Sequence, residues 1–176
     1  MGKAMWWKGF NDAKQKDLCM KQQSEKDRFY NSVGEAMSMN DFRSFINIET
    51  LEVDTHASED YFSWGDEEDS AQEAIENPDK FLPIQNIHSS VGFGVMEDFI
   101  ETVKSTVLQF QLRQALQGKK PFANFKIKID NSLERQNWFD FRDQAYAVIA
   151  KQWLEDNACE ALLEKIKGLP SVFMAE

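Results

Sequence analysis

Apolar residues in this 176-residue chain follow two different periods, and the change between them defines the expected fold. Between Phe42 and Ile48, successive side chains alternate between two faces, which is the period of a β-strand. Beyond Ser89, apolar residues recur every three or four positions, which is the period of a helix that buries one face. The sequence therefore predicts a mostly helical α+β protein, with a small N-terminal antiparallel sheet followed by a cluster of four or five helices.

The sheet is expected between residues 42 and 84. Residues 42–48 and 51–53 predict a β-hairpin. Residues 81–84 (Phe-Leu-Pro-Ile) predict a short edge strand, because Pro83 has no N–H to donate to a ladder.

Each predicted helix begins at a residue type that suits a helix N-terminus. The expected starts are Ser24, Ser89 or Ser90, Ser105, Pro121, the capping-box-like run 131–134, and Asn157 with Glu160. Gly118 and Gly168 are expected to end helices. The helix after residue 134 is expected to be long and to bury Trp138, Phe141, Ala145, Val148, Ile149 and Trp153.

The chain length fits one domain that buries roughly two-thirds of its unfolded surface. Residues 1–23 are polar and lysine-rich around Trp6, Trp7 and Phe10, and are predicted to be an N-terminal appendage. Residues 24–176 are predicted to form a single α+β domain.

No signal for export or membrane anchoring is apparent. No stretch reaches the ~18 apolar residues of a membrane span, and Lys8 interrupts the apolar run that starts at Met5. Cys19 and Cys159 lie far apart and belong to no metal-binding motif. We therefore expect a cytoplasmic protein with no disulfide, metal, cofactor or membrane partner.

Charge is unevenly distributed along the chain. The net charge is -10, from 30 acidic and 20 basic residues. Residues 54–79 contain ten Asp and Glu and no Lys or Arg, so this acidic segment accounts for the whole net charge. Residues 103–129 contain six Lys and Arg and no Asp or Glu. Negative charge is therefore concentrated in the acidic segment and positive charge in this second segment, which we call the basic stretch.

Three runs from residue 81 onward resemble one known family. They are residues 81–84, an uninterrupted Met-Glu-Asp-Phe-Ile-Glu-Thr at 96–102, and a Trp-x-x-Phe-Arg-Asp at 138–143. In this order they resemble the bacterial uncharacterised protein family numbered 158, over roughly residues 81–156. The hairpin resembles it more loosely, because Thr50-Leu51 replaces a Thr-Gly turn, and Gly accepts a positive φ that Leu disfavours. The resemblance implies no activity, since none is assigned to the family.

Arg142 is the most informative charged residue. At about 100° per residue it falls within the apolar arc of its helix, so we expect it to be partly buried and paired with a carboxylate. Glu97 borders the apolar stripe of an earlier helix and Glu101 lies one step further out, which favours a structural Glu97–Arg142 ion pair. The alternative is that Glu97 and Glu101 are acid/base or metal-binding carboxylates, although no His completes such a site.

Three functions follow from these features. The first is a non-enzymatic binding or regulatory protein, whose acidic segment contacts an unknown protein partner through Tyr61, Phe62 and Trp64. The second is RNA binding by the basic stretch, with interleaved phenylalanines stacking on bases. The cations for this role are Arg113, Lys119, Lys120, Lys126 and Lys128. The third is an enzyme that uses Glu97 and Glu101.

The basic stretch has two other interpretations. It is also consistent with a solvated helix face whose phenylalanines Phe110, Phe122 and Phe125 lie in the core. Alternatively, the acidic segment 54–79 lies against the basic stretch and screens it from anionic partners.

Overall fold

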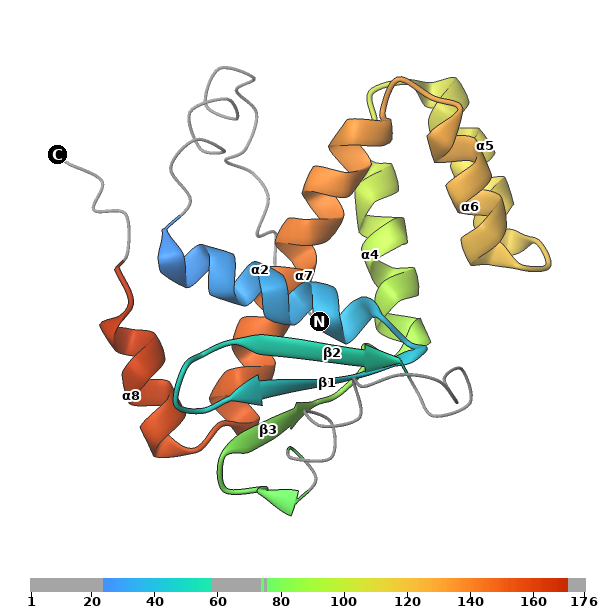
Figure 1. Ribbon diagram of the computed structural model, residues 1–176. Helices are drawn as coiled ribbons and strands as arrows, with labels where there is room; N and C mark the ends of the chain where they lie inside the picture. The colour runs from blue at the N-terminus through green and yellow to red at the C-terminus, as the bar shows by residue number, and fades with distance from the viewer. Residues whose placement is uncertain (1–23, 58–73, 75, 171–176) are drawn as a thin grey trace, which may run out of the picture.

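The computed structural model describes residues 24–57, 74 and 76–170, and in these ranges it shows six helices and a three-stranded sheet (Figure 1). The strands are β1 Phe42–Asn47, β2 Val53–Ala57 and β3 Phe81–Ile84. The helices are α2 Glu25–Ser38, α4 Ser89–Thr102, α5 Thr106–Gln117, α6 Pro121–Asp130, α7 Arg135–Asn157 and α8 Glu160–Gly168. Of these helices, α5 and α6 lie away from the sheet (Figure 1). The predicted α+β class is confirmed, with five helices after the sheet.

The sheet is antiparallel in the order β2-β1-β3, so β1 is the central strand. Ile46 pairs with Val53 on one side and with Leu82 on the other, and these residues share the face that packs on the helices. Phe45 lies on the opposite face and pairs with Pro83 of β3. The predicted edge strand is therefore confirmed, since Pro83 lies in a strand with only one neighbour.

The connection between β1 and β2 departs from the prediction. The second strand begins at Val53 rather than Leu51, because Leu51 has a φ of 63° and is left-handed. Asn47 supports this turn, since its side-chain oxygen accepts hydrogen bonds from the N–H groups of Glu49 and Thr50. The Leu51 side chain packs against the buried core, and this contact offsets part of the backbone cost of about 1–2 kcal/mol.

The largest of three buried clusters in the described residues, which we call the sheet core, lies between the sheet, α2, α8 and the C-terminal half of α7. Its buried residues are Phe29, Val33, Ala36, Met37, Ile46, Ile84, Ile87, Ala150, Leu154, Leu162 and Ile166. At its centre, α2 and α7 touch through their backbones. A Cβ atom on Gly34 would lie 2.7 Å from the carbonyl carbon of Tyr146, so only glycine fits at this crossing.

The predicted start of α2 is confirmed by a capping box. The Ser24 hydroxyl accepts a hydrogen bond from the Asp27 N–H, and the Asp27 carboxylate accepts one from the Ser24 N–H. Two otherwise unpaired donors of the first turn are satisfied in this way, which fixes where α2 begins.

The second core, which we call the aromatic core, is enclosed by α4, α5, α6 and the N-terminal part of α7. Its buried residues are Met96, Phe99, Ile100, Val103, Leu112, Leu116, Phe125 and Ile129. Trp138 of α7 packs edge-on against Phe99 and Phe125, with ring centroids 5.2 and 4.8 Å apart. Such edge-to-face contacts add to the area that the rings bury. The predicted boundaries at Ser105, Gly118 and Pro121 are confirmed.

Helix α7 contributes to both cores, which explains one error in the prediction. Trp138 and Phe141 pack on the aromatic core, whereas Ala150 and Leu154 are buried in the sheet core. Because its partners lie on two sides, α7 has no single buried face along its length. Val148, which we predicted to be buried, is 66% exposed.

Three predicted helix starts differ in their capping. Asn157, predicted with Glu160 to start the last helix, is the last residue of α7, and the N-cap of α8 is Cys159. The capping box expected at 131–134 does not form, because the Ser132 hydroxyl accepts from the Glu134 N–H and α7 begins at Arg135 without a side-chain cap. The N-cap of α4 is His88, whose ring nitrogen accepts from the Ser90 N–H. The predicted appendage 1–23 and most of the acidic segment lie outside the described residues.

Candidate functional site

Arg142 is partly buried, as predicted, with 32% of its side chain exposed. The carboxylate that it contacts is that of Asp143 rather than Glu97. Its Nε and Nη2 atoms donate to one Asp143 oxygen at 2.9 and 2.6 Å, and its guanidinium lies 5.0 Å from the centre of the Phe139 ring. The charge of Arg142 is therefore balanced by Asp143 on the same helix, and Arg142 does not link α7 to α4 through an ion pair with Glu97.

Glu97 and Glu101 are both exposed on α4. Glu101 accepts a hydrogen bond from Arg113 of α5 at 2.8 Å, so it is part of an ion pair between these helices. The structure does not bring Glu97, Glu101 and Arg142 together as one constellation.

The five cations predicted to bind RNA lie on one helical hairpin but not on one face. Arg113 is paired with Glu101. Lys126 and Lys128 are two residues apart on α6, which places them about 200° apart around the helix. Lys119 and Lys120 lie in the turn between α5 and α6, where Lys120 has a φ of 58°. The positive charge is thus divided between the turn and two sides of α6.

The predicted protein-binding residues Tyr61, Phe62 and Trp64 lie outside the described residues. The same holds for the proposed contact between residues 58–73 of the acidic segment and the basic stretch.

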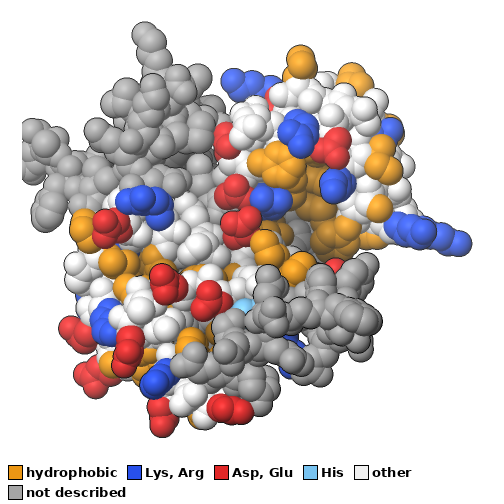
Figure 2. Space-filling view, viewed as in Figure 1, with side chains coloured by type: hydrophobic (Ala, Val, Ile, Leu, Met, Phe, Trp, Pro, Cys, Tyr) orange, Lys and Arg blue, Asp and Glu red, His pale blue; other side chains and the backbone are white. Residues whose placement is uncertain are grey.

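Exposed apolar side chains gather instead on α5, α6 and the loop that follows. Val107 and Phe110 on α5 are 67% and 63% exposed, Ile127 on α6 is 58% exposed, and Leu133 in the loop is 102% exposed. Figure 2 shows hydrophobic side chains at the surface of the lobe that holds these helices, with Lys and Arg side chains beside them. Apolar groups that cluster in this way mark interaction sites more often than singly scattered ones do.

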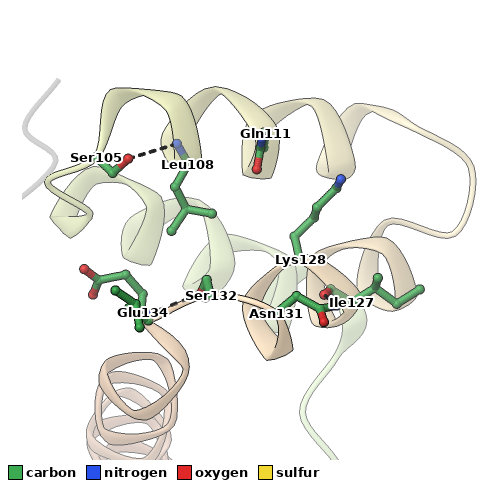
Figure 3. A pocket seen from close by; sticks show the side chains of 9 residues that line it. Ser105, Leu108, Gln111, Ile127, Lys128, Asn131, Ser132 and Glu134 are labelled. Atoms are coloured by element: carbon green, nitrogen blue, oxygen red, sulfur yellow. Dashed lines mark hydrogen bonds between the residues drawn. The ribbon is translucent and has the colours of Figure 1, made fainter.

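A shallow groove of about 450 Å³, which we call the α5–α6 groove, opens beside these side chains (Figure 3). Leu108, Ile127 and Leu133 provide its apolar surface, while Gln111 and Lys128 provide polar groups. The complete lining is Ser105, Leu108, Gln111, Ile127, Lys128, Asn131, Ser132, Leu133 and Glu134. These residues come from three consecutive segments of the chain: α5, the end of α6, and the loop before α7.

Hydrogen bonds hold the loop that presents Leu133. The Ser132 hydroxyl donates to the Ile129 carbonyl at 2.9 Å and accepts from the Glu134 N–H at 3.2 Å. Asn137 of α7 donates to the Glu134 carboxylate at 2.6 Å. The loop is therefore anchored on both sides of Leu133, and its full exposure is a property of an ordered turn.

Residues 24–57, 74 and 76–170 offer little for metal or membrane chemistry. No group of three or more His, Cys, Asp or Glu side chains in these ranges is placed to hold a metal ion. The helices of the described part include none that is both long and apolar enough to cross a bilayer. Cys159 is an exposed free thiol.

Two tyrosines have raised pKa values for structural reasons. Burial is the main cause for Tyr146, whose pKa is also raised by Asp143 and lowered by Arg142. Burial likewise raises the pKa of Tyr30, with smaller contributions from Glu155 and Asp27. Neither tyrosine lines the α5–α6 groove.

The sequence contains a signal for this surface in the spacing of its apolar residues. Phe110 and Ile127 each lie two residues from a residue buried in the aromatic core, Leu112 or Phe125. Two residues correspond to about 200° on a helix, so both side chains had to point away from that core. Leu133 carried no such signal, because it lies in a loop.

The fold and the groove define a class of protein: a small α+β domain with a helical hairpin that displays apolar and basic side chains. The chain belongs to UPF0158, an uncharacterised protein family whose model matches residues 63–174. The resemblance inferred from residues 81–156 is thereby confirmed.

One relative is the UPF0158 protein PA5073 of Pseudomonas aeruginosa, which is 33% identical over 85 residues. The match covers 47% of this chain and 56% of that relative, so it spans little more than half of the relative's length. No solved structure matches the chain.

Proposed function

We propose that this protein is a non-enzymatic binding or regulatory protein of the cytoplasm, and that its α5–α6 groove is a contact surface for a protein partner. The observation that carries the proposal is the pair of exposed apolar side chains that line the groove, Ile127 and Leu133, on a lobe that also exposes Val107 and Phe110 of α5. Burying a side chain such as Leu contributes about 1.5–3 kcal/mol of favourable free energy. These side chains do not gain that free energy while they remain exposed to water. A partner that covers these residues would gain this free energy.

The arrangement suits protein binding better than catalysis. Leu108, Ile127 and Leu133 give the groove an apolar surface among polar lining residues, and a protein interface likewise combines an apolar core with a polar rim. The carboxylates considered for an enzyme, Glu97 and Glu101, do not line it. The proposal therefore assigns the described surface a binding role.

The test is affinity capture of partners from the native cell with three versions of the full chain: wild type, Leu133→Glu, and the control Val148→Glu. Val148 is as exposed as Val107 but lies on α7, away from the groove. Both substitutions are expected to change the free energy of unfolding by less than about 0.5 kcal/mol, because both sites are exposed. Partners retained by wild type and Val148→Glu but lost with Leu133→Glu support the proposal, and equal retention by all three contradicts it.

RNA binding by the basic stretch is the second candidate, supported by exposed lysines at 119, 120, 126 and 128. Reversing the charge of Lys119, Lys120 and Lys126 together would abolish salt-sensitive retention of RNA if this candidate holds. Absence of RNA retention by wild type at low salt would exclude it.

A further inference from the structure

We infer that the segment bound in the α5–α6 groove is an acidic amphipathic α-helix of another protein. This inference rests on the proposed function and adds the chemistry of the partner. It follows from the shape of the groove, from the charges around it, and from the helix ends that open onto it.

The shape of the groove favours a helix over an extended peptide. Extended peptides usually bind by adding a strand to a free sheet edge, whereas an amphipathic helix lays one apolar stripe into a hydrophobic groove. The α5–α6 groove is built from helices and a loop, and its apolar residues Leu108, Ile127 and Leu133 come from three segments. A ligand that contacts all three must present several apolar side chains along one side, which the i, i+3, i+4, i+7 spacing of a helix provides.

The charges around the groove favour an acidic partner. Lys128 lines the groove, and Lys104 immediately precedes its first residue, Ser105. Within the part of the chain that the structure describes, neither lysine has an ion pair. Of the nearby carboxylates, Asp130 is paired with Arg135 at 3.1 Å, whereas Glu134 keeps its charge because its donor, the Asn137 amide at 2.6 Å, is neutral. Two unpaired lysines against this one unpaired carboxylate leave the rim with a net positive charge.

Two helix N-termini add to this positive potential. α5 begins after Ser105 and α7 begins after Glu134, and both of these residues line the groove. Each N-terminus carries the positive end of a helix dipole, equivalent to about half an elementary charge, against one negative end from α6 at Asn131. The first turn of α7 has no side-chain cap, so its N–H groups are available to an acceptor from the partner.

The experiment is a selection of phage-displayed random 16-residue peptides on the full-length protein, with counter-selection on Leu133→Glu. The enriched peptides are expected to carry apolar residues at three- and four-residue spacing, a net charge of about −3 or lower, and a circular dichroism signal that becomes helical on binding. The counter-selection removes peptides that bind elsewhere on the protein.

Synthetic copies of the enriched peptides are then titrated by fluorescence anisotropy. Lys128→Glu is expected to weaken binding about tenfold or more, and added NaCl is expected to weaken wild-type binding because it screens the rim charges. The matched control is Lys151→Glu, an exposed lysine of α7 outside the groove, which should change the affinity by less than about twofold.

Enriched peptides that are neutral or basic, or that stay extended when bound, overturn the acidic helix and leave the groove as a protein-binding site. Failure to enrich any peptide also overturns the inference. If partner capture then proves independent of Leu133 as well, the proposed function is overturned with it. Groove-dependent binding of a 15-residue oligouridine in place of peptides would assign the surface to single-stranded RNA.

Discussion

The sheet core and the aromatic core differ in the size of the side chains that bring their helices together. In the sheet core, the decisive contact is made by the smallest residue, because Gly34 lets the backbones of α2 and α7 touch. In the aromatic core, large rings fill the space between helices, and Phe99 meets Phe125, Trp138 and Phe141 edge-on. The first core depends on an absent side chain and the second on bulky ones.

The two regions also differ in what they leave uncovered. In the described part of the chain, the sheet core is closed on one side by the sheet and on others by α2, α7 and α8. The aromatic core is closed by one face of α5 and one face of α6, and the opposite faces carry Phe110 and Ile127 into solvent. This difference is the reason that the proposed contact surface is placed on the aromatic half of the molecule.

Phe99→Ala should have the largest effect and should break the aromatic core. Removing this 1% exposed ring is expected to lower the free energy of unfolding by about 3–5 kcal/mol, through lost burial and the cavity left behind. Hydrogen exchange should accelerate in α5 and α6 more than in α2 and β1. The control Phe110→Ala removes a 63% exposed ring and should change stability by less than about 0.5 kcal/mol. Equal losses for both variants would contradict the aromatic core as described.

Gly34→Ala should break the sheet core. The new Cβ atom would force the backbones of α2 and α7 apart, at a cost of about 3 kcal/mol. Gly94 of α4 is the matched control, because a Cβ atom there meets nothing within 4 Å. Gly94→Ala should stabilise the protein by up to about 1 kcal/mol through helix propensity. Urea unfolding of both variants measures the contrast, and a Gly34→Ala variant as stable as wild type would show that the helices cross elsewhere.

Two glycine substitutions compare the turn between α5 and α6 with the turn between β1 and β2. Lys120 joins α5 to α6 and Leu51 joins β1 to β2, and both have a positive φ. Lys120→Gly relieves backbone strain at an exposed position and should stabilise the protein by about 1 kcal/mol. Leu51→Gly relieves similar strain but loses contacts with the sheet core, so its net effect should be within about 1 kcal/mol of zero. The control Leu51→Ala loses the contacts without relieving the strain, and thermal unfolding should rank it below Leu51→Gly.

The smallest effect concerns Tyr146, whose backbone contacts α2 and whose hydroxyl points toward Gly92 of α4. Burial raises its pKa above the ordinary value of 10.0. As the pH rises past 10.0, unfolded tyrosine loses its proton while folded Tyr146 keeps it, so the stability that this difference contributes is lost at alkaline pH. Tyr146→Phe should therefore lose stability less steeply than wild type between about pH 9 and pH 11. Denaturant titrations at these values measure the slope, and an unchanged slope would contradict the contribution of Tyr146.

Much of the fold was predictable because its signals are local. Ser24, Ser105, Gly118 and Pro121 lie at helix ends, where the unpaired backbone groups select particular residue types. The strands β1 and β3 followed from alternation and from Pro83. The family was identified from short runs of sequence, and the match over residues 63–174 confirms it.

The remainder depended on which surfaces meet in space. The helical periodicity correctly predicted that Arg142 is partly buried. It carries no information on whether the ion-pair partner is Glu97 of another helix or the adjacent residue Asp143. Val148 was predicted as buried because the pattern was assumed to serve one core, whereas α7 serves two. The groove escaped prediction because exposure of Leu133 is set by loop hydrogen bonds, and no periodicity reports on a loop.

The sharing of α7 between the two cores has a consequence for the chain as it leaves the ribosome. α2, the sheet and α4 are synthesised before α7, yet Gly34 lacks its neighbour Tyr146, and Phe99 lacks Trp138 and Phe141, until α7 has emerged. α8 closes the sheet core later still, and its Lys165 donates to the carbonyl of Glu49, 116 positions earlier. Translation therefore exposes apolar segments of the nascent chain before the residues that bury them have been synthesised.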